Sequence, residues 1–237
     1  MITQRYNYSP LNRTTIDGSR HYSLPDGSAV PSVTTILDRT KPAEARESLA
    51  KWRKSIGEAR AQQITTEAAA RGTRMHSYLE SYVLTGELKD FPSNPFAQPS
   101  WLMAAQVILQ GLDHVTEYWG VEVPVYYSGL YAGTTDCVGE WKGRPAIVDF
   151  KQTNKPKKKE WITDYYLQLC AYAQAHNATH GTDIKTGVIC MAVKPELLED
   201  NRGYSTPEYL EFVIKDEEFE YWTNEWIKRV ELYYLTA

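Results

Sequence analysis

The sequence has few cysteines, no long apolar run and no excess of basic residues. Its three cysteines, Cys137, Cys170 and Cys190, lie far apart without a Cys-x-x-Cys pair. This argues against a disulfide framework, a zinc finger and a four-cysteine iron–sulfur cluster. No segment approaches the roughly 18 apolar residues that a membrane helix needs, and the N-terminus lacks the apolar core of a signal peptide. We therefore expect a soluble, intracellular, cytoplasmic protein with no membrane partner.

The charge balance also narrows the functional classes. The 237 residues carry 26 lysines and arginines against 30 acids, a net charge of −4, so the chain lacks the overall basic character of a sequence-specific DNA-binding protein. An enzyme that acts on nucleic acid stays possible, because it needs only local positive charge beside acidic metal ligands. The 17 tyrosines are unusual. Most should fill the core, and a few exposed rings would suit stacking on single-stranded bases.

Hydrophobic periodicity predicts a mainly helical first half and a β-rich second half. We expect a hairpin around Pro25-Asp26-Gly27, a β-rich or capping segment over 31–37, and two or three helices between 42 and 86 with breaks near Gly57 and Gly72. A further helix is expected over 101–119. The second half predicts strands at 121–127, 131–141, 145–151, 186–194 and 209–215, with helices at 160–176 and 216–235.

This order, helices followed by β-β-β-α-β-β-α, indicates an α/β (α+β) fold with a mixed central sheet flanked by helices. No low-complexity linker divides the chain. We therefore expect one domain, in which the hairpin and helices of 1–120 cover the site and 121–237 form the core.

Two carboxylates and a lysine suggest chemistry. Asp136 and Asp149 stand on neighbouring predicted strands joined by a tight turn. Two close carboxylates repel unless a cation lies between them, and hard oxygen ligands suit Mg²⁺ or Mn²⁺. Strand alternation places Lys151 on the face of Asp149 and Phe150 on the other. Lys151 would then orient a water or stabilise charge on a phosphate; a surface ion pair with Asp149 is the simpler interpretation.

Three further patterns accompany these residues. His76 ends the pattern Gly-Thr-x-x-His, and Glu80 shares its helix face. Asp136 ends Gly-x-x-Asp, and Asp149 begins Asp-x-Lys. Gln168 and Tyr172 form Gln-x-x-x-Tyr on one face of a predicted helix. Each pattern is weak alone, but the four follow in a fixed order.

That order resembles the RecB-like branch of the PD-(D/E)XK nuclease superfamily, and within it the exonuclease group that includes the mitochondrial genome maintenance exonucleases and related phage exonucleases. The resemblance runs from about residue 30 to about residue 175 and includes the 31–37 segment. It implies a restriction-endonuclease-like core. It also implies that Asp136, Asp149, His76 and the Phe150 carbonyl bind the metal, that Lys151 is the catalytic lysine, and that Gln168 and Tyr172 position the substrate backbone.

Some acids and two motifs fall outside this resemblance. Glu80 is suggested only by its helical register, and Glu122 and Glu140 are assigned structural roles. The chain cannot supply the four cluster cysteines of the AddB-type nucleases and the CRISPR-associated nucleases. It also contains no Gly-x-x-x-x-Gly-Lys-[Ser/Thr] P-loop of a RecB helicase.

The function implied is a metal-dependent DNA exonuclease that uses Mg²⁺ or Mn²⁺ on single-stranded DNA with a free end, in replication, repair or recombination. Six basic residues are expected to contact the DNA: Arg71, Arg74, Lys155, Lys157, Lys158 and Lys159. Three alternatives stay open: a structure-specific or double-strand endonuclease, a non-catalytic nucleic-acid-binding or recombination module, and a metal enzyme on a small molecule. The sequence is compatible with a monomer and identifies no protein partner. The short form resembles bacterial and phage proteins.

Overall fold

The structure is a computed structural model that describes residues 2–199 and 203–236. Its centre is a five-stranded mixed sheet in the order β4-β5-β6-β7-β8. The strands are β4 (Val115–Tyr127), β5 (Tyr131–Trp141), β6 (Arg144–Thr153), β7 (Thr186–Val193) and β8 (Tyr209–Lys215). All neighbours are antiparallel except β6 and β7, which are joined by a helical crossover. The predicted mixed sheet flanked by helices is confirmed.

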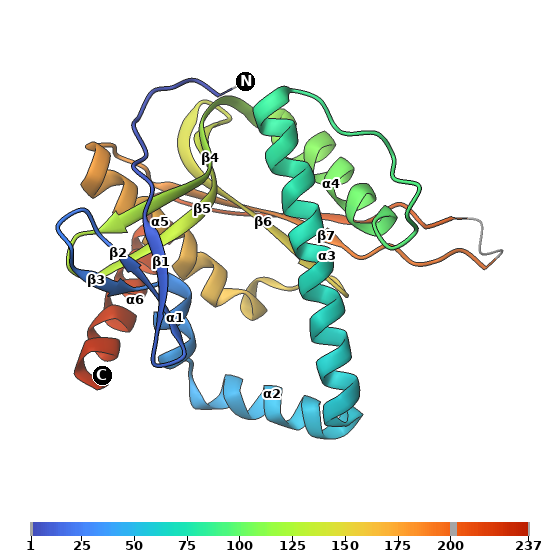
Figure 1. Ribbon diagram of the computed structural model, residues 1–237, viewed down its shortest axis with the longest axis horizontal. Coiled ribbons are helices and arrows are strands. Elements are labelled where there is room, and N and C mark those ends of the chain that lie inside the picture. The colour runs from blue at the N-terminus through green and yellow to red at the C-terminus, as the bar shows by residue number, and fades with distance from the viewer. Residues whose placement is uncertain (1, 200–202, 237) are drawn as a thin grey trace.

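Helices cover both faces of this sheet (Figure 1). One face packs on α1 (Val33–Arg39), α5 (Thr163–His180) and α6 (Asp216–Thr236). The other packs on α3 (Glu58–Thr85) and α4 (Gln98–Gln110). Helix α2 (Ala43–Ile56) links α1 to the foot of α3, and all its residues are exposed or half-buried (Figure 1). Short 3-10 turns lie at Leu112–His114 and Lys159–Trp161.

A second, three-stranded antiparallel sheet precedes α1. It consists of β1 (Asn12–Ile16), β2 (Ser19–Ser23) and β3 (Ala29–Pro31). The turn at Pro25-Asp26-Gly27 joins β2 to β3, as predicted. The sequence did not predict β1, because all five of its residues are exposed and show no apolar alternation. Tyr22, Leu24 and Val30 pack on Ala132 of β5 and anchor this sheet to the core.

Two predicted boundaries were wrong. Helix α3 continues through Gly72, which lies against Gln152 of β6, where an added Cβ would be 3.4 Å from Gln152 Cγ. The helix expected over 101–119 ends at Gln110, and the chain enters β4 at Val115. The 3-10 turn at Leu112–His114 brings Leu112 and Val115 into the core three residues apart, a spacing that also fits a helix, so the apolar pattern does not mark the helix end. The core therefore begins near residue 115 rather than 121.

The sheet forks between β5 and β6. Their pairing ends at Cys137 and Val148. Beyond this point β5 continues to pair with β4, while β6 continues to pair with β7. The next residues along the two strands are Asp136 and Asp149, so the fork places both acids at its opening.

Candidate metal-dependent active site

The fork leaves a backbone amide of β6 facing a side chain instead of a strand. The Phe150 N–H donates to Asp136 Oδ2 at 2.7 Å. The Phe150 ring points to the opposite face, where it is buried against the α3–α4 layer. The main chain of β6 thus holds the Asp136 carboxylate at the fork.

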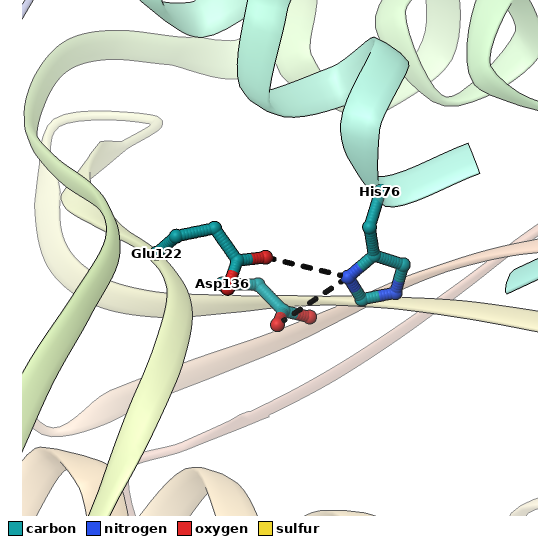
Figure 2. A group of neighbouring side chains, drawn as sticks. All are labelled: His76, Glu122 and Asp136. Atoms are coloured by element: carbon teal, nitrogen blue, oxygen red, sulfur yellow. Dashed lines mark ion pairs between the residues drawn. The ribbon is translucent and has the colours of Figure 1, made fainter. Parts of the chain in front are cut away.

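His76 reaches the same point from α3. Its Nε2 lies 2.9 Å from the Phe150 carbonyl oxygen, so Nε2 carries a proton and donates it. Its Nδ1 faces Glu122 Oε1 and Asp136 Oδ1, each at 3.6 Å (Figure 2). Burial lowers the pKa of His76, but Glu122 and Asp136 oppose this effect and the net pKa is raised. Nδ1 therefore sits where a proton or a metal cation is favoured.

Glu122 is the residue that sequence reasoning assigned a structural role. Its neighbours Val121 and Val123 pair with Cys137 and Thr135, so Glu122 lies opposite Asp136 across the β4–β5 ladder. Like charges directly opposite each other destabilise a sheet. Glu122 also has a φ of 49°, a backbone region that costs free energy for a residue with a side chain. Glu122 thus combines electrostatic repulsion from Asp136 with an unfavourable backbone conformation, and such a costly position favours a functional role for its side chain.

Asp149 and Lys151 form an ion pair at the base of the site. Asp149 Oδ2 lies 2.5 Å from Lys151 Nζ, which confirms that the two side chains share a face. Asp149 is 1% exposed, so the pair is not the surface interaction considered above. Burial raises the pKa of Asp149 to about 6 against the opposing effect of Lys151. Among the described residues, Asp149 Oδ1 is buried without a hydrogen-bond partner.

Gln168 and Tyr172 lie on α5 and complete one wall. Gln168 Nε2 donates to the Tyr172 hydroxyl at 2.9 Å. The Tyr172 ring is buried against the backbone of Gly133, where an added Cβ would lie only 2.6 Å from Tyr172 Cε1. The glycine of Gly-x-x-Asp is therefore required for the close approach of α5 to β5.

These groups surround a cavity of about 310 Å³. Five of the six predicted catalytic residues line it, and the sixth, Asp149, lies behind Lys151. The sequence-based prediction did not include several other lining residues, notably Glu122, Arg13, Arg20, Tyr22, Ser32 and Thr34. Glu80 is not among the lining residues.

The predicted DNA-binding residues lie elsewhere. Arg71 is 6% exposed, and its guanidinium donates to Gln152 and Asn154, so its charge joins α3 to β6 and the segment after it. Arg74 is half-buried on α3. The four lysines of 155–159 are exposed in the segment after β6 and do not line the cavity.

The residues present fit a divalent cation. One ligand atom from each of His76, Glu122 and Asp136 lies within 4.8 Å of the others. Imidazole nitrogen and carboxylate oxygen are ligands of Mn²⁺, and carboxylates also suit Mg²⁺. Asp149 adds a buried, under-satisfied carboxylate beside this group.

Comparison with known proteins supports the predicted relationship. No protein-family model matches the chain. The mitochondrial genome maintenance exonuclease 1 of Xenopus tropicalis is 28% identical over 94% of this chain and 64% of its own length. Its Mus musculus and Homo sapiens counterparts are 28% identical over 87% of this chain and 59% and 58% of theirs. The chain thus spans about six tenths of the length of the curated relatives it matches.

A crystal structure of a protein assigned as an exonuclease from Eubacterium rectale aligns with a TM-score of 0.48 at 15% identity, over 70% of this chain and 64% of that one. The resemblance to RecB-like exonucleases inferred from the motifs is confirmed by the sequence relatives. In the part of the chain that the structure describes, no helix is both long and apolar enough to cross a bilayer.

Proposed function

We propose that this chain, a relative of the mitochondrial genome maintenance exonucleases, is a metal-dependent deoxyribonuclease that hydrolyses phosphodiester bonds. The observation that carries the proposal is the group at the sheet fork. His76, Glu122 and Asp136 form a compact cation-binding set, and the buried Asp149–Lys151 pair lies in the same site. A cation site next to a lysine in a polar cavity suits hydrolysis at a phosphate.

The proposed roles follow from the positions of the side chains. Mg²⁺ or Mn²⁺, held by His76, Glu122 and Asp136 with Asp149 and the Phe150 carbonyl next to them, would supply a water of lowered pKa and neutralise phosphate charge. The Phe150 N–H keeps Asp136 oriented.

The ammonium of Lys151 is positioned by Asp149 and faces the cavity, where it donates to a phosphate oxygen and stabilises the charge that develops in the transition state. The Gln168–Tyr172 pair holds the substrate backbone on the α5 side.

We further propose that the substrate is single-stranded DNA with a free end. Support comes from the word exonuclease in the names of the relatives, because an exonuclease removes nucleotides from a chain end. A comparison of linear with circular single-stranded DNA tests this. Linear strands should disappear while circles persist, and rapid cutting of circles would favour the endonuclease alternative.

The central experiment is digestion of end-labelled linear single-stranded DNA with Mg²⁺, Mn²⁺ or EDTA. Wild type should cleave with metal only, and Lys151→Ala should lose cleavage. The matched control is Lys142→Ala, because Lys142 lies on the β5–β6 turn in an exposed ion pair with Glu211. Labels at the 5′ and 3′ ends report the polarity. DNA binding without cleavage in wild type would support a non-catalytic binding module.

The exposed lysines after β6 are proposed to contact the DNA backbone. Replacing Lys157, Lys158 and Lys159 with glutamine should weaken DNA binding and reduce its salt dependence, by a slope of about 0.7 for each lost single-strand contact. Fluorescence anisotropy at several salt concentrations measures both quantities. An unchanged affinity and slope would show that the lysines are only a solvated segment.

A further inference from the structure

Two arginines that the proposed chemistry does not use face the site from the N-terminal sheet. Arg13 of β1 pairs with Tyr22 of β2, and Arg20 lies two residues before Tyr22 on the same strand. Side chains opposite each other or two residues apart share one face of a sheet. Arg13, Arg20 and Tyr22 therefore project together, and all three line the cavity that contains His76 and Lys151.

This face is held firmly against the core. Tyr22 is 5% exposed and packs on Ala132, and its hydroxyl lies 3.4 Å from Thr134 Oγ1 of β5. The carbonyl of Arg20 accepts from the Ser32 N–H and from the Thr35 hydroxyl, each at 2.9 Å. The backbone at Arg20 is thus tied to α1 by two hydrogen bonds.

No described residue neutralises the two guanidinium groups. Within residues 2–199 and 203–236, neither arginine has a carboxylate at ion-pair distance, and neither side chain makes a hydrogen bond. The two acids that line the cavity, Glu122 and Asp136, are grouped with His76 instead. The cavity therefore has an acidic, cation-binding side and a separate basic side.

We propose that Arg13 and Arg20 bind a phosphate of the DNA strand other than the one that is cut, and thereby fix the position of the strand over the site. The inference rests on the proposed nuclease function. Guanidinium groups match phosphate oxygens with paired hydrogen bonds. At about 310 Å³, the cavity is near the lower limit of ligand pockets, about 300 Å³. One nucleotide would fill a cavity of this size, so the neighbouring phosphate of the strand would lie at the cavity wall formed by Arg13 and Arg20.

Binding of short single-stranded oligonucleotides in EDTA tests this without requiring cleavage. We expect Arg13→Gln with Arg20→Gln to weaken binding by about tenfold for each arginine and to lower the salt slope by about 1.4. Lysine at both positions should restore part of the affinity. The control is Arg144→Gln, because Arg144 pairs with Asp216 at the far end of β6. All the replaced side chains are exposed, so thermal melting should show intact folding.

A set of oligonucleotides with a single uncharged methylphosphonate at successive positions locates the phosphate. Wild type should lose affinity at one position, and the double variant should lose nothing further there. Oligonucleotides with 5′-phosphate, 3′-phosphate or hydroxyl ends distinguish a terminal from an internal phosphate, and either result supports the proposal if the arginines are required. Wild-type affinity in the double variant, or equal methylphosphonate losses in both proteins, would overturn it. If wild type binds DNA in this arginine-dependent way but does not cleave it, the result would count against the proposed nuclease activity and not against phosphate binding by the two arginines.

Discussion

Replacement of Glu122 by glutamine tests the residue that the structure adds to the predicted metal site. Without metal, the change removes a negative charge that faces Asp136 between the pairs Val121–Cys137 and Val123–Thr135. Cross-strand pairs of this kind differ by about 0.2–1 kcal/mol. At a pH high enough to deprotonate His76, whose charged form Glu122 favours, the metal-free variant should therefore be slightly more stable than wild type. With metal, the same change removes an anionic ligand from the group of three.

The two effects have opposite signs, which makes the test sharp. A ligand at about 100 times its dissociation constant stabilises a protein by about 2.7 kcal/mol, and a hundredfold weaker affinity reduces this to about 0.4 kcal/mol. For a chain of this length, 1 kcal/mol corresponds to roughly 2–4 °C in melting temperature. Wild type should therefore gain about 5–11 °C with saturating Mn²⁺, and Glu122→Gln about 1 °C.

The assay is thermal unfolding in EDTA and across a Mn²⁺ or Mg²⁺ titration. Glu140→Gln is the matched control, because Glu140 also lies on the central sheet but faces Arg5 at 3.5 Å. It should keep the full metal-induced shift. An equal shift in Glu122→Gln and wild type would refute Glu122 as a ligand, and a destabilised metal-free variant would refute the repulsion argument.

Three other changes test the packing and the titration behaviour. Gly133→Ala places a Cβ 2.6 Å from the buried Tyr172 ring, so urea unfolding should show a loss of about 1–3 kcal/mol, and single-turnover cleavage should slow. In Gly72→Ala the added Cβ meets the Gln152 side chain, at 3.4 Å from Cγ and 3.9 Å from Nε2, which is near ordinary contact. The gain in helix propensity should therefore raise stability by up to about 1 kcal/mol, and a lower melting temperature would contradict this. Burial, and to a lesser extent the charge of the nearby His180, lowers the pKa of His176 to about 3. The neutral His176 therefore stabilises the fold above its unfolded pKa of about 6.5, and this stabilisation is lost as the pH falls below that value. Between about pH 7.5 and about pH 5 the loss is about 2 kcal/mol, and a His176→Asn variant should show a flatter pH profile.

The sequence predicted the strands well because alternation and turns are local signals. The β-β-β-α-β-β-α order and the shared face of Asp149 and Lys151 follow from these signals alone. The fork between β5 and β6 does not follow from local signals, because it depends on the point at which the two strands stop pairing. Sequence spacing therefore identified the acids without showing that Asp149 is buried behind its lysine.

The sequence shows which residues are charged but not which way their side chains point in the fold. Arg71 looked like a DNA contact because it lies in a basic helical segment, but its guanidinium is satisfied by Gln152 and Asn154 across the α3–β6 contact. Arg13 gives no local signal because β1 is exposed along its whole length and resembles a loop. Arg20 is an exposed residue of β2 next to the predicted hairpin, and nothing in the sequence shows that its side chain faces the site. In both cases the direction of the side chain depends on which strand the segment packs against, a long-range property.

Glu122 shows the limit most clearly. It stands between Val121 and Val123, so alternation places it on the face opposite to them, which in a half-buried strand is usually solvent. In the structure the alternation is broken at Glu122: Val121 packs on the α3–α4 side and Val123 on the α5 side. The Glu122 carboxylate then lies 3.6 Å from Nδ1 of His76 on α3. The sequence also gives no sign of the positive φ at position 122, because the residue there is glutamate and not glycine or asparagine, which usually adopt this conformation. A strained, acidic strand residue becomes recognisable as a candidate ligand only once the helix above it is known.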